Sequence, residues 1–238
     1  MGGGGATAGV DAGRHGTHQN CLGTHGVRGR SVNRERLHAF SVAGLLLGWS
    51  VLAPRVPRRW YPAPHVLLGA AAVATTDAPL GVRPPALTQG LRWGSAAAAT
   101  VVAAVALSAT LTPVRAGMAA RKPPASPATW LLLHIPLGTV WSEEAGYRAS
   151  LGSVAARAFG VTGGRLFTAA VFGLSHIPDA RAARDSVPGT VLVTGAAGWV
   201  FSWLRDRSGS LAAPMLAHLA VNEAGAVAAV VFSRPIRD

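Results

Sequence analysis

The sequence predicts an all-α, polytopic membrane protein, a bundle of about seven or eight transmembrane helices. Half of the 238 residues are hydrophobic and only 13% are charged, and the mean hydropathy is +0.32. Uncharged windows of roughly the 17 to 25 residues that a helix needs to cross a bilayer recur along the chain. Several ionisable residues also lie inside apolar stretches, where they are costly unless they serve a purpose.

Five uncharged windows are long enough to span the hydrocarbon layer, and two further windows are shorter or interrupted. The long windows cover residues 37–54, 60–76, 93–114, 123–142 and 186–204, and the others cover 166–178 and 208–233. Much of their apolarity comes from alanine, so each helix inserts with a small margin, and abundant Ala and Gly permit close helix approach. A soluble, Ala-rich helical domain is the alternative, which the number of uncharged windows disfavours.

The net charge of +12 does not indicate nucleic-acid binding, because the basic residues form no patch interleaved with aromatic residues. Arginines flank the apolar windows instead, which is typical of anchors at the membrane interface. We therefore expect the lipid bilayer, and no nucleic acid, as a partner. Nearly every loop carries Arg, so only the arginines before residue 37 favour an inside N-terminus.

Two regions are predicted: a tail over residues 1–36 and a transmembrane domain over residues 37–238. The tail is rich in Gly and lacks hydrophobic periodicity, so we expect it to be disordered. Its His15, His18, His25 and Cys21 have irregular spacing, which does not indicate a metal site. Cys21 is the only cysteine, so no disulfide within the chain can form. The first apolar window is expected to act as an uncleaved signal anchor.

The first candidate motif is Glu143-Glu144-x-x-x-Arg148, directly after an apolar window. Glu144 and Arg148 share one helical face at i, i+4 spacing and are expected to pair. Glu143 then projects toward the side of Tyr147 as a free carboxylate. A carboxylate in a poorly solvated pocket suits a general acid or base. Alternatively, both acids are solvated at a helix end.

The second motif places Phe172 one helical turn before His176, with Pro178 ending the helix. An aromatic ring at this spacing would form a pocket wall and fix the imidazole. The alternative is an interfacial or hydrogen-bonded histidine without a chemical role.

The third motif is His218-x-x-x-Asn222, whose side chains share a helical face and point at one spot. Pro214, one turn earlier, either starts this helix or kinks it. The structural alternative is a hydrogen bond between helices, a common use of His and Asn in membranes.

Together these residues form a hydrolytic set: a base to activate water and donors for an oxyanion. An equally consistent set has Glu143, His176 and His218 holding a divalent metal such as zinc, assisted by Glu144 or Asn222. The sequence contains no His-Glu-x-x-His motif, no Gly-x-Ser-x-Gly motif and no Gly-rich phosphate loop.

The order and spacing of the three motifs, over about residues 130–230, resemble the CPBP (Abi) family of intramembrane proteases, which includes the eukaryotic type II CAAX prenyl endopeptidase. The resemblance implies a bundle of about eight helices around a conical cavity and peptide-bond hydrolysis as the activity. It implies that Glu143 and His176 activate water and that His218 and Asn222 bind the oxyanion. Supporting roles fall to the remaining motif residues, Glu144, Arg148 and Phe172.

The resemblance leaves metal dependence open, because a glutamate-based mechanism without metal has also been proposed for the family. Asn is a poor zinc ligand and a good hydrogen-bond donor, which favours the metal-free mechanism. A composition rich in Arg, Ala, Gly and Pro is typical of a GC-rich bacterial genome, so we expect a bacterial cell membrane, where prenylated CAAX proteins are not an obvious substrate. The resemblance implies a membrane-associated or lipidated substrate. The alternative of another class is a non-enzymatic protein for bacteriocin self-immunity, a scaffold or a carrier.

Overall fold

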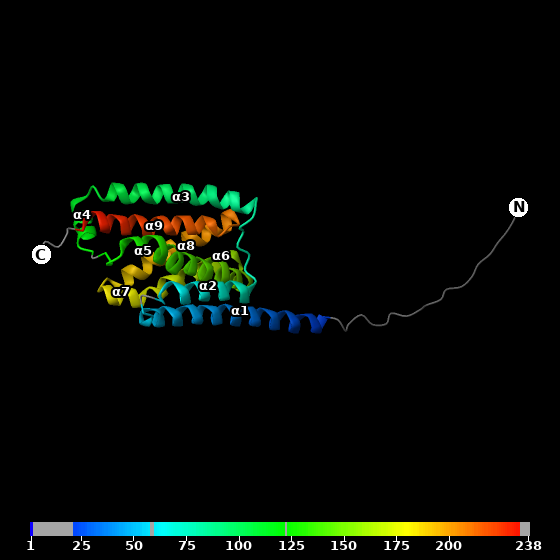
Figure 1. Cartoon of the computed structure of the whole chain (residues 1–238). Helices are drawn as coiled ribbons and strands as arrows, with labels where there is room; N and C mark the ends of the chain where they lie inside the picture. The colour runs from blue at the N-terminus through cyan, green and yellow to red at the C-terminus, as the bar shows by residue number, and fades with distance from the viewer. Residues whose placement is uncertain (2–20, 58–59, 122, 234–238) are drawn as a thin grey trace. The chain divides into compact units, whose positions relative to one another are not determined.

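The computed structural model describes Met1 and residues 21–57, 60–121 and 123–233, which form helices and no strand. The predicted all-α class is therefore confirmed for these residues (Figure 1). The chain divides into two units, Met1–Arg34 and Glu35–Asp238. The helices are α1 (Cys21–Leu52), η1 (Ala53–Arg55), α2 (Pro62–Thr76), α3 (Ala86–Ser108), α4 (Thr112–Ala119), α5 (Pro127–Thr129), η3 (Trp130–Trp141), η4 (Glu144–Leu151), α6 (Gly152–Ser175), α7 (Ile177–Ala183), α8 (Val187–Ser208) and α9 (Ala212–Phe232).

The predicted tail and the described structure overlap only in part. Residues 2–20 lie outside the described residues, so the disorder predicted for them stays a prediction. Helix α1 begins at Cys21, within the segment assigned to the tail, and thus earlier than the predicted boundary at residue 37. The side chains of His15, His18, Cys21 and His25 also lie outside the described part.

Four helices are long and apolar enough to cross a membrane, judged by length and composition: Val32–Arg55, Ala86–Ser108, Val187–Ser208 and Ala212–Phe232. Each overlaps a predicted window. The windows at 60–76, 123–142 and 166–178 correspond to α2, to α5 with η3, and to the second part of α6. The described residues thus provide four candidate spans, and the larger predicted number stays a prediction.

Large apolar side chains are exposed on the outer faces of the candidate spans. Leu192 and Val193 on α8 are 73% and 70% exposed, and Leu107 on α3 is 70% exposed. Such extended apolar surfaces are unfavourable in water and are the normal surface of a protein in lipid. The exposure pattern therefore agrees with the composition.

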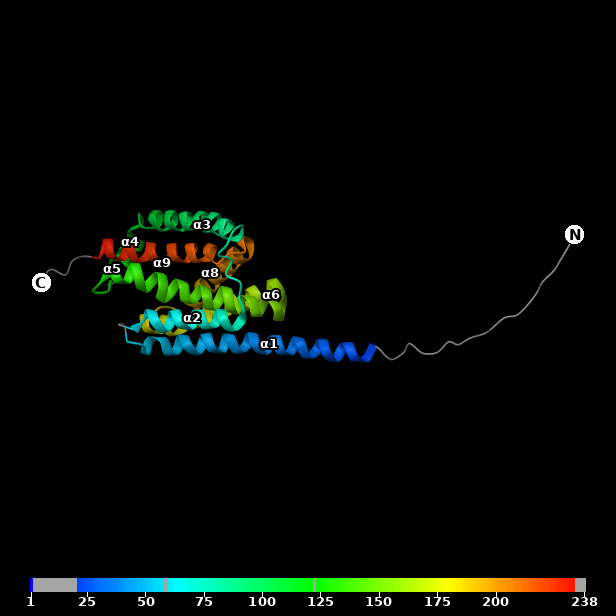
Figure 2. The ribbon, with the colours of Figure 1, turned by 45° about the vertical axis from the view of Figure 1, so that its right-hand side comes forward.

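Helices α3 and α9 lie side by side (Figures 1 and 2), and α6 lies against α8. The close approach of α3 and α9 depends on small residues. A Cβ atom at Gly94 would lie 2.9 Å from the Cα atom of Ala213, too close for any side chain. In lipid the hydrophobic effect does not drive helices together, so close packing of small residues is the expected source of their association.

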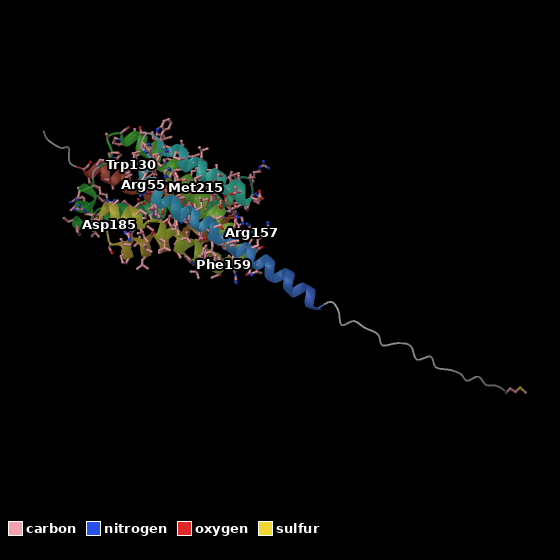
Figure 3. All side chains as sticks on the ribbon, turned by 90° about the horizontal axis from the view of Figure 1, so that it is seen from below. Arg55, Trp130, Arg157, Phe159, Asp185 and Met215 are labelled. Carbon is pink, nitrogen blue, oxygen red and sulfur yellow. The ribbon has the colours of Figure 1, made fainter. Side chains whose placement is uncertain are left out.

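Helix α6 changes direction at Gly160, whose φ of 74° and ψ of 170° are not helical. A positive φ of this size strains any residue with a Cβ atom. Beyond it, Gly164 packs against the backbone of the first half of the helix, since a Cβ there would lie 2.6 Å from the nitrogen of Ala156. Phe159, labelled in Figure 3, stacks near Phe167 with ring centroids 5.1 Å apart.

The ends of α8 and the start of α9 follow local sequence signals. The Ser186 hydroxyl accepts a hydrogen bond from the Gly189 amide at the start of α8, and Gly209 ends α8 in the left-handed conformation. Pro214 lies in the first turn of α9. Of the two roles predicted for Pro214, it therefore starts the helix, as proline does where no amide partner is needed.

Replacing Gly164 by Ala should lower the free energy of unfolding by about 1 to 3 kcal/mol, because the new methyl group meets backbone atoms that cannot move aside. Gly225→Ala on α9 is the matched control, since nothing lies within 4 Å of its Cβ position. The control should be neutral or stabilising, because Ala favours helix. Thermal unfolding of the detergent-purified variants measures both, and equal effects would contradict the close contact.

Candidate active site

Glu143 and Glu144 lie where two π-helical stretches, η3 and η4, meet. The wider i→i+5 turn of a π-helix is rare and occurs frequently at functional sites. Every residue of η4 is buried, including Glu144 with 0% of its surface exposed. Burial excludes the alternative of Glu144 as a solvated residue at a helix end.

A single carboxylate oxygen, Oε1 of Glu144, holds the buried polar network together. It accepts a hydrogen bond from Nη1 of Arg148 at 3.0 Å and another from Nδ1 of His218 at 2.7 Å. The predicted pair of Glu144 with Arg148 is therefore confirmed. A carboxylate only accepts, so Nδ1 of His218 carries a proton and Nε2 faces away from Glu144.

Aromatic rings enclose this network. Phe201 of α8 stacks on His218, with ring centroids 4.9 Å apart and planes at 22°. The Arg148 guanidinium lies 3.9 Å from the centroid of Phe172, close enough for a cation–π interaction. The Phe172 ring meets His176 edge-on at 4.7 Å, so it forms the wall that the sequence predicted.

Glu143 is the accessible acid of the pair. It lines a cavity of about 190 Å³ together with Tyr147 and His176, on the side of the helix predicted for its side chain. The Glu143 side chain is 27% exposed, and its Oε2 lies 3.8 Å from Nε2 of His218. Oε2 has no hydrogen-bond partner among the described residues. Glu143 thus joins the cavity to the buried network.

The orientation of His176 is fixed by its own helix. Its Nδ1 donates a hydrogen bond of 2.8 Å to the carbonyl oxygen of Phe172, one turn earlier. A carbonyl oxygen cannot donate, so in the neutral ring Nε2 is the nitrogen without a proton. His176 lines the cavity and therefore has a proton acceptor available there.

Asn222 lies one turn after His218, as the spacing predicts, but its amide points back to its own helix. Nδ2 donates to the carbonyl oxygen of His218 at 3.2 Å. The residues that line the cavity of Glu143 and His176 include neither His218 nor Asn222. An oxyanion role for Asn222 stays a prediction and requires its amide to leave this carbonyl.

Comparison with known families decides the relationship. Residues 125–224 match the model of the type II CAAX prenyl endopeptidase Rce1-like family. This segment of the chain is therefore similar to an Rce1-like domain. No curated protein and no solved structure matches the chain. The match supports the resemblance to the CAAX-type intramembrane proteases, and with the four apolar helices it indicates an integral membrane protein.

Helices outside the Rce1-like match contribute side chains that sequence reasoning missed. Trp49, Tyr61 and His65, from α1 and the start of α2, line the same cavity as Glu143. Nδ1 of His65 donates to the Tyr61 carbonyl at 2.6 Å, and the two rings lie 4.2 Å apart. The available signal was an ionisable residue inside an apolar window, the criterion that selected the other histidines.

The described residues do not assemble the metal site that the sequence allowed. In the described part of the chain, no three His, Cys, Asp or Glu side chains are placed to hold one metal ion. Nε2 of His218 faces Oε2 of Glu143, but His176 does not complete a ligand set with them. A catalytic zinc needs three protein ligands, which the described side chains do not provide in one place.

Glu144→Gln should lower the free energy of unfolding by about 3 to 5 kcal/mol, because the buried Arg148 loses its counter-charge. Asp206→Asn is the matched control, since it removes an acid from an ion pair with Arg165 that reaches the surface. The control should cost about 1 kcal/mol or less. Thermal unfolding of both variants in detergent tests this, and similar losses would contradict a central role for Glu144.

Proposed function

We propose that the chain is an intramembrane endopeptidase that hydrolyses a peptide bond of a membrane-associated or lipidated substrate. The observation that carries the proposal is the position of Glu143. Its carboxylate opens into a cavity shared with His176, while His218 approaches it from the buried side at 3.8 Å. An acid that shares a cavity with one imidazole and lies near a second suits proton transfer to and from a bound water.

In this proposal Glu143 and His176 activate the water. The carboxylate of Glu143, whose side chain is 27% exposed, takes the proton as the water oxygen adds to the substrate carbonyl. His176 orients the water through Nε2, because Nδ1 is held by the Phe172 carbonyl. The role of a general base requires both groups within hydrogen-bond reach of one water, and their shared cavity supports this.

In this proposal His218 donates a hydrogen bond to the oxyanion of the tetrahedral intermediate, and Asn222 is a second donor. Nδ1 of His218 is committed to Glu144, so Nε2 donates only if the ring carries protons on both nitrogens. Nε2 is also the nitrogen that lies toward Glu143, 3.8 Å from its Oε2. Donors aimed at a developing negative charge contribute strongly in a water-poor site.

The second step of hydrolysis releases both products and regenerates the enzyme. Collapse of the tetrahedral intermediate breaks the carbon–nitrogen bond, and the proton held by Glu143 moves to the leaving nitrogen. The products are a peptide acid and a free amine, and the carboxylate of Glu143 is restored. One carboxyl group thus serves as base in the first step and as acid in the second.

The proposal also includes the finer architecture: about seven or eight spans around a conical cavity, in a bacterial cell membrane. Support comes from α2 and η3, which are apolar but fall short of the length of the four candidate spans. The second part of α6, beyond Gly160, would supply a further crossing.

A non-enzymatic role, in bacteriocin self-immunity or as a scaffold, is the second candidate. The observation that favours it is Asn222, whose amide is bonded to its own helix and does not face the cavity. The buried network of Glu144, Arg148 and His218 would then serve only to join helices.

Glu143→Gln should abolish peptide release while leaving the free energy of unfolding nearly unchanged, because the side chain keeps its shape and Oε2 makes no hydrogen bond within the described residues. The measurement is mass spectrometry of peptides released from membranes that contain equal amounts of wild-type and variant protein. Glu223→Gln on α9 is the control, since Glu223 does not line the cavity. Identical peptide profiles for wild type and Glu143→Gln would favour the non-enzymatic role.

Asn222→Ala should lower kcat by roughly 100-fold or more with little change in KM, the signature of a donor used only in the transition state. Steady-state kinetics on a peptide identified by the release experiment measure this. An unchanged kcat with a raised KM would instead place Asn222 in substrate binding.

A further inference from the structure

A second cavity of about 170 Å³ lies on the other side of Arg148 and belongs to no part of the proposed reaction. Residues from η4, α6 and α8 enclose it. Its polar lining consists of Arg148, Ser153, Arg165, Thr168, Ser202, Arg205 and Asp206. Val161 and Asp206 are 60% and 43% exposed at its edge, so the cavity opens to the surface.

The charges around this cavity do not balance. Glu144 compensates Arg148 at 3.0 Å, and Asp206 compensates Arg165 at 2.7 Å. Arg205 has no carboxylate within ion-pair distance among the described residues, and its Nη2 donates to the carbonyl oxygen of Pro79. The half-buried guanidinium of Arg205 therefore has no counter-charge among the described residues.

Several hydrogen-bond donors at the cavity also lack partners. Nε and Nη2 of the fully buried Arg148, Nε of Arg205 and the hydroxyl of the buried Thr168 have none within the described ranges. A buried donor left without a partner costs about 1 to 3 kcal/mol. Each of these atoms has almost no accessible surface, so a ligand reaches them only after the side chains turn toward the cavity that the three residues line.

We propose that this cavity binds an oxyanion of the phosphate type, either a phospholipid headgroup or free phosphate. A tetrahedral anion supplies the missing negative charge and several acceptor oxygens at once, and Arg is the preferred residue for such groups. The position fits both sources, because the cavity opens beside Arg165 and Asp206, near the C-terminal end of α8.

The ligand would also support the active site. Arg148 lines this cavity and holds Glu144 with Nη1. An anion bound beside the guanidinium would therefore fix Glu144 and, through it, His218. Binding itself does not require that the chain is a protease.

The test is thermal unfolding of the delipidated full chain in a non-ionic detergent, titrated with sodium phosphate at constant ionic strength. Phosphate should raise Tm of the wild type saturably, by about 5 to 10 °C at a hundredfold excess over Kd. Arg205→Gln should abolish the rise, and Thr168→Val should weaken binding with no change in charge. Arg207→Gln is the matched control, because Arg207 lies on the same helix but outside this cavity.

A second arm separates the two sources. Dioctanoyl phosphatidylglycerol is compared with dioctanoylglycerol, which has the same chains and no phosphate. If the phospholipid raises Tm at lower concentrations than inorganic phosphate does, and dioctanoylglycerol has no effect, the site binds a headgroup. If inorganic phosphate is as potent as the phospholipid, the site binds the free anion. If neither ligand raises Tm, or if Arg205→Gln and Thr168→Val respond as the wild type does, the cavity holds water only and the proposal is wrong.

Discussion

The site depends on the buried Oε1 of Glu144, which accepts hydrogen bonds from both Arg148 and His218. Burying a carboxylate and a guanidinium is costly, so this contact is better explained by positioning than by stability. It joins η4 to α9, segments far apart in the chain, and fixes which nitrogen of His218 faces Glu143. The surroundings of the accessible Glu143 therefore depend on the buried Glu144.

The sequence predicted those parts of the site that lie within one helix. The i, i+4 spacing predicted the pair of Glu144 and Arg148, the contact of Phe172 with His176, and the exposure of Glu143 on the side of Tyr147. These contacts depend only on helical geometry. Spacing alone did not indicate that Asn222 would bond to its own backbone, because an Asn side chain can satisfy itself locally.

Contacts between distant helices were beyond prediction. His65 and Tyr61 form a wall of the cavity, and although His65 is an ionisable residue in an apolar window, nothing in that window indicates that it lies beside Glu143. The bond from His218 to Glu144 likewise depends on how α9 packs on η4, which periodicity does not report. The all-α class was predictable because it follows from composition and window length, whereas the number of crossings depends on short helices such as α2.

The π-helical backbone of η3 and η4 has a consequence for the evolution of the chain. A wide turn of this kind accommodates more residues per turn than an α-helix, so the segment from Trp130 to Leu151 depends on its length as well as its composition. Loss of one residue would let the tighter α-helical pairing return and rotate Glu143 and Glu144 away from their partners. We therefore expect insertions and deletions in this segment to displace the two acids, even at positions where many different apolar side chains would fit.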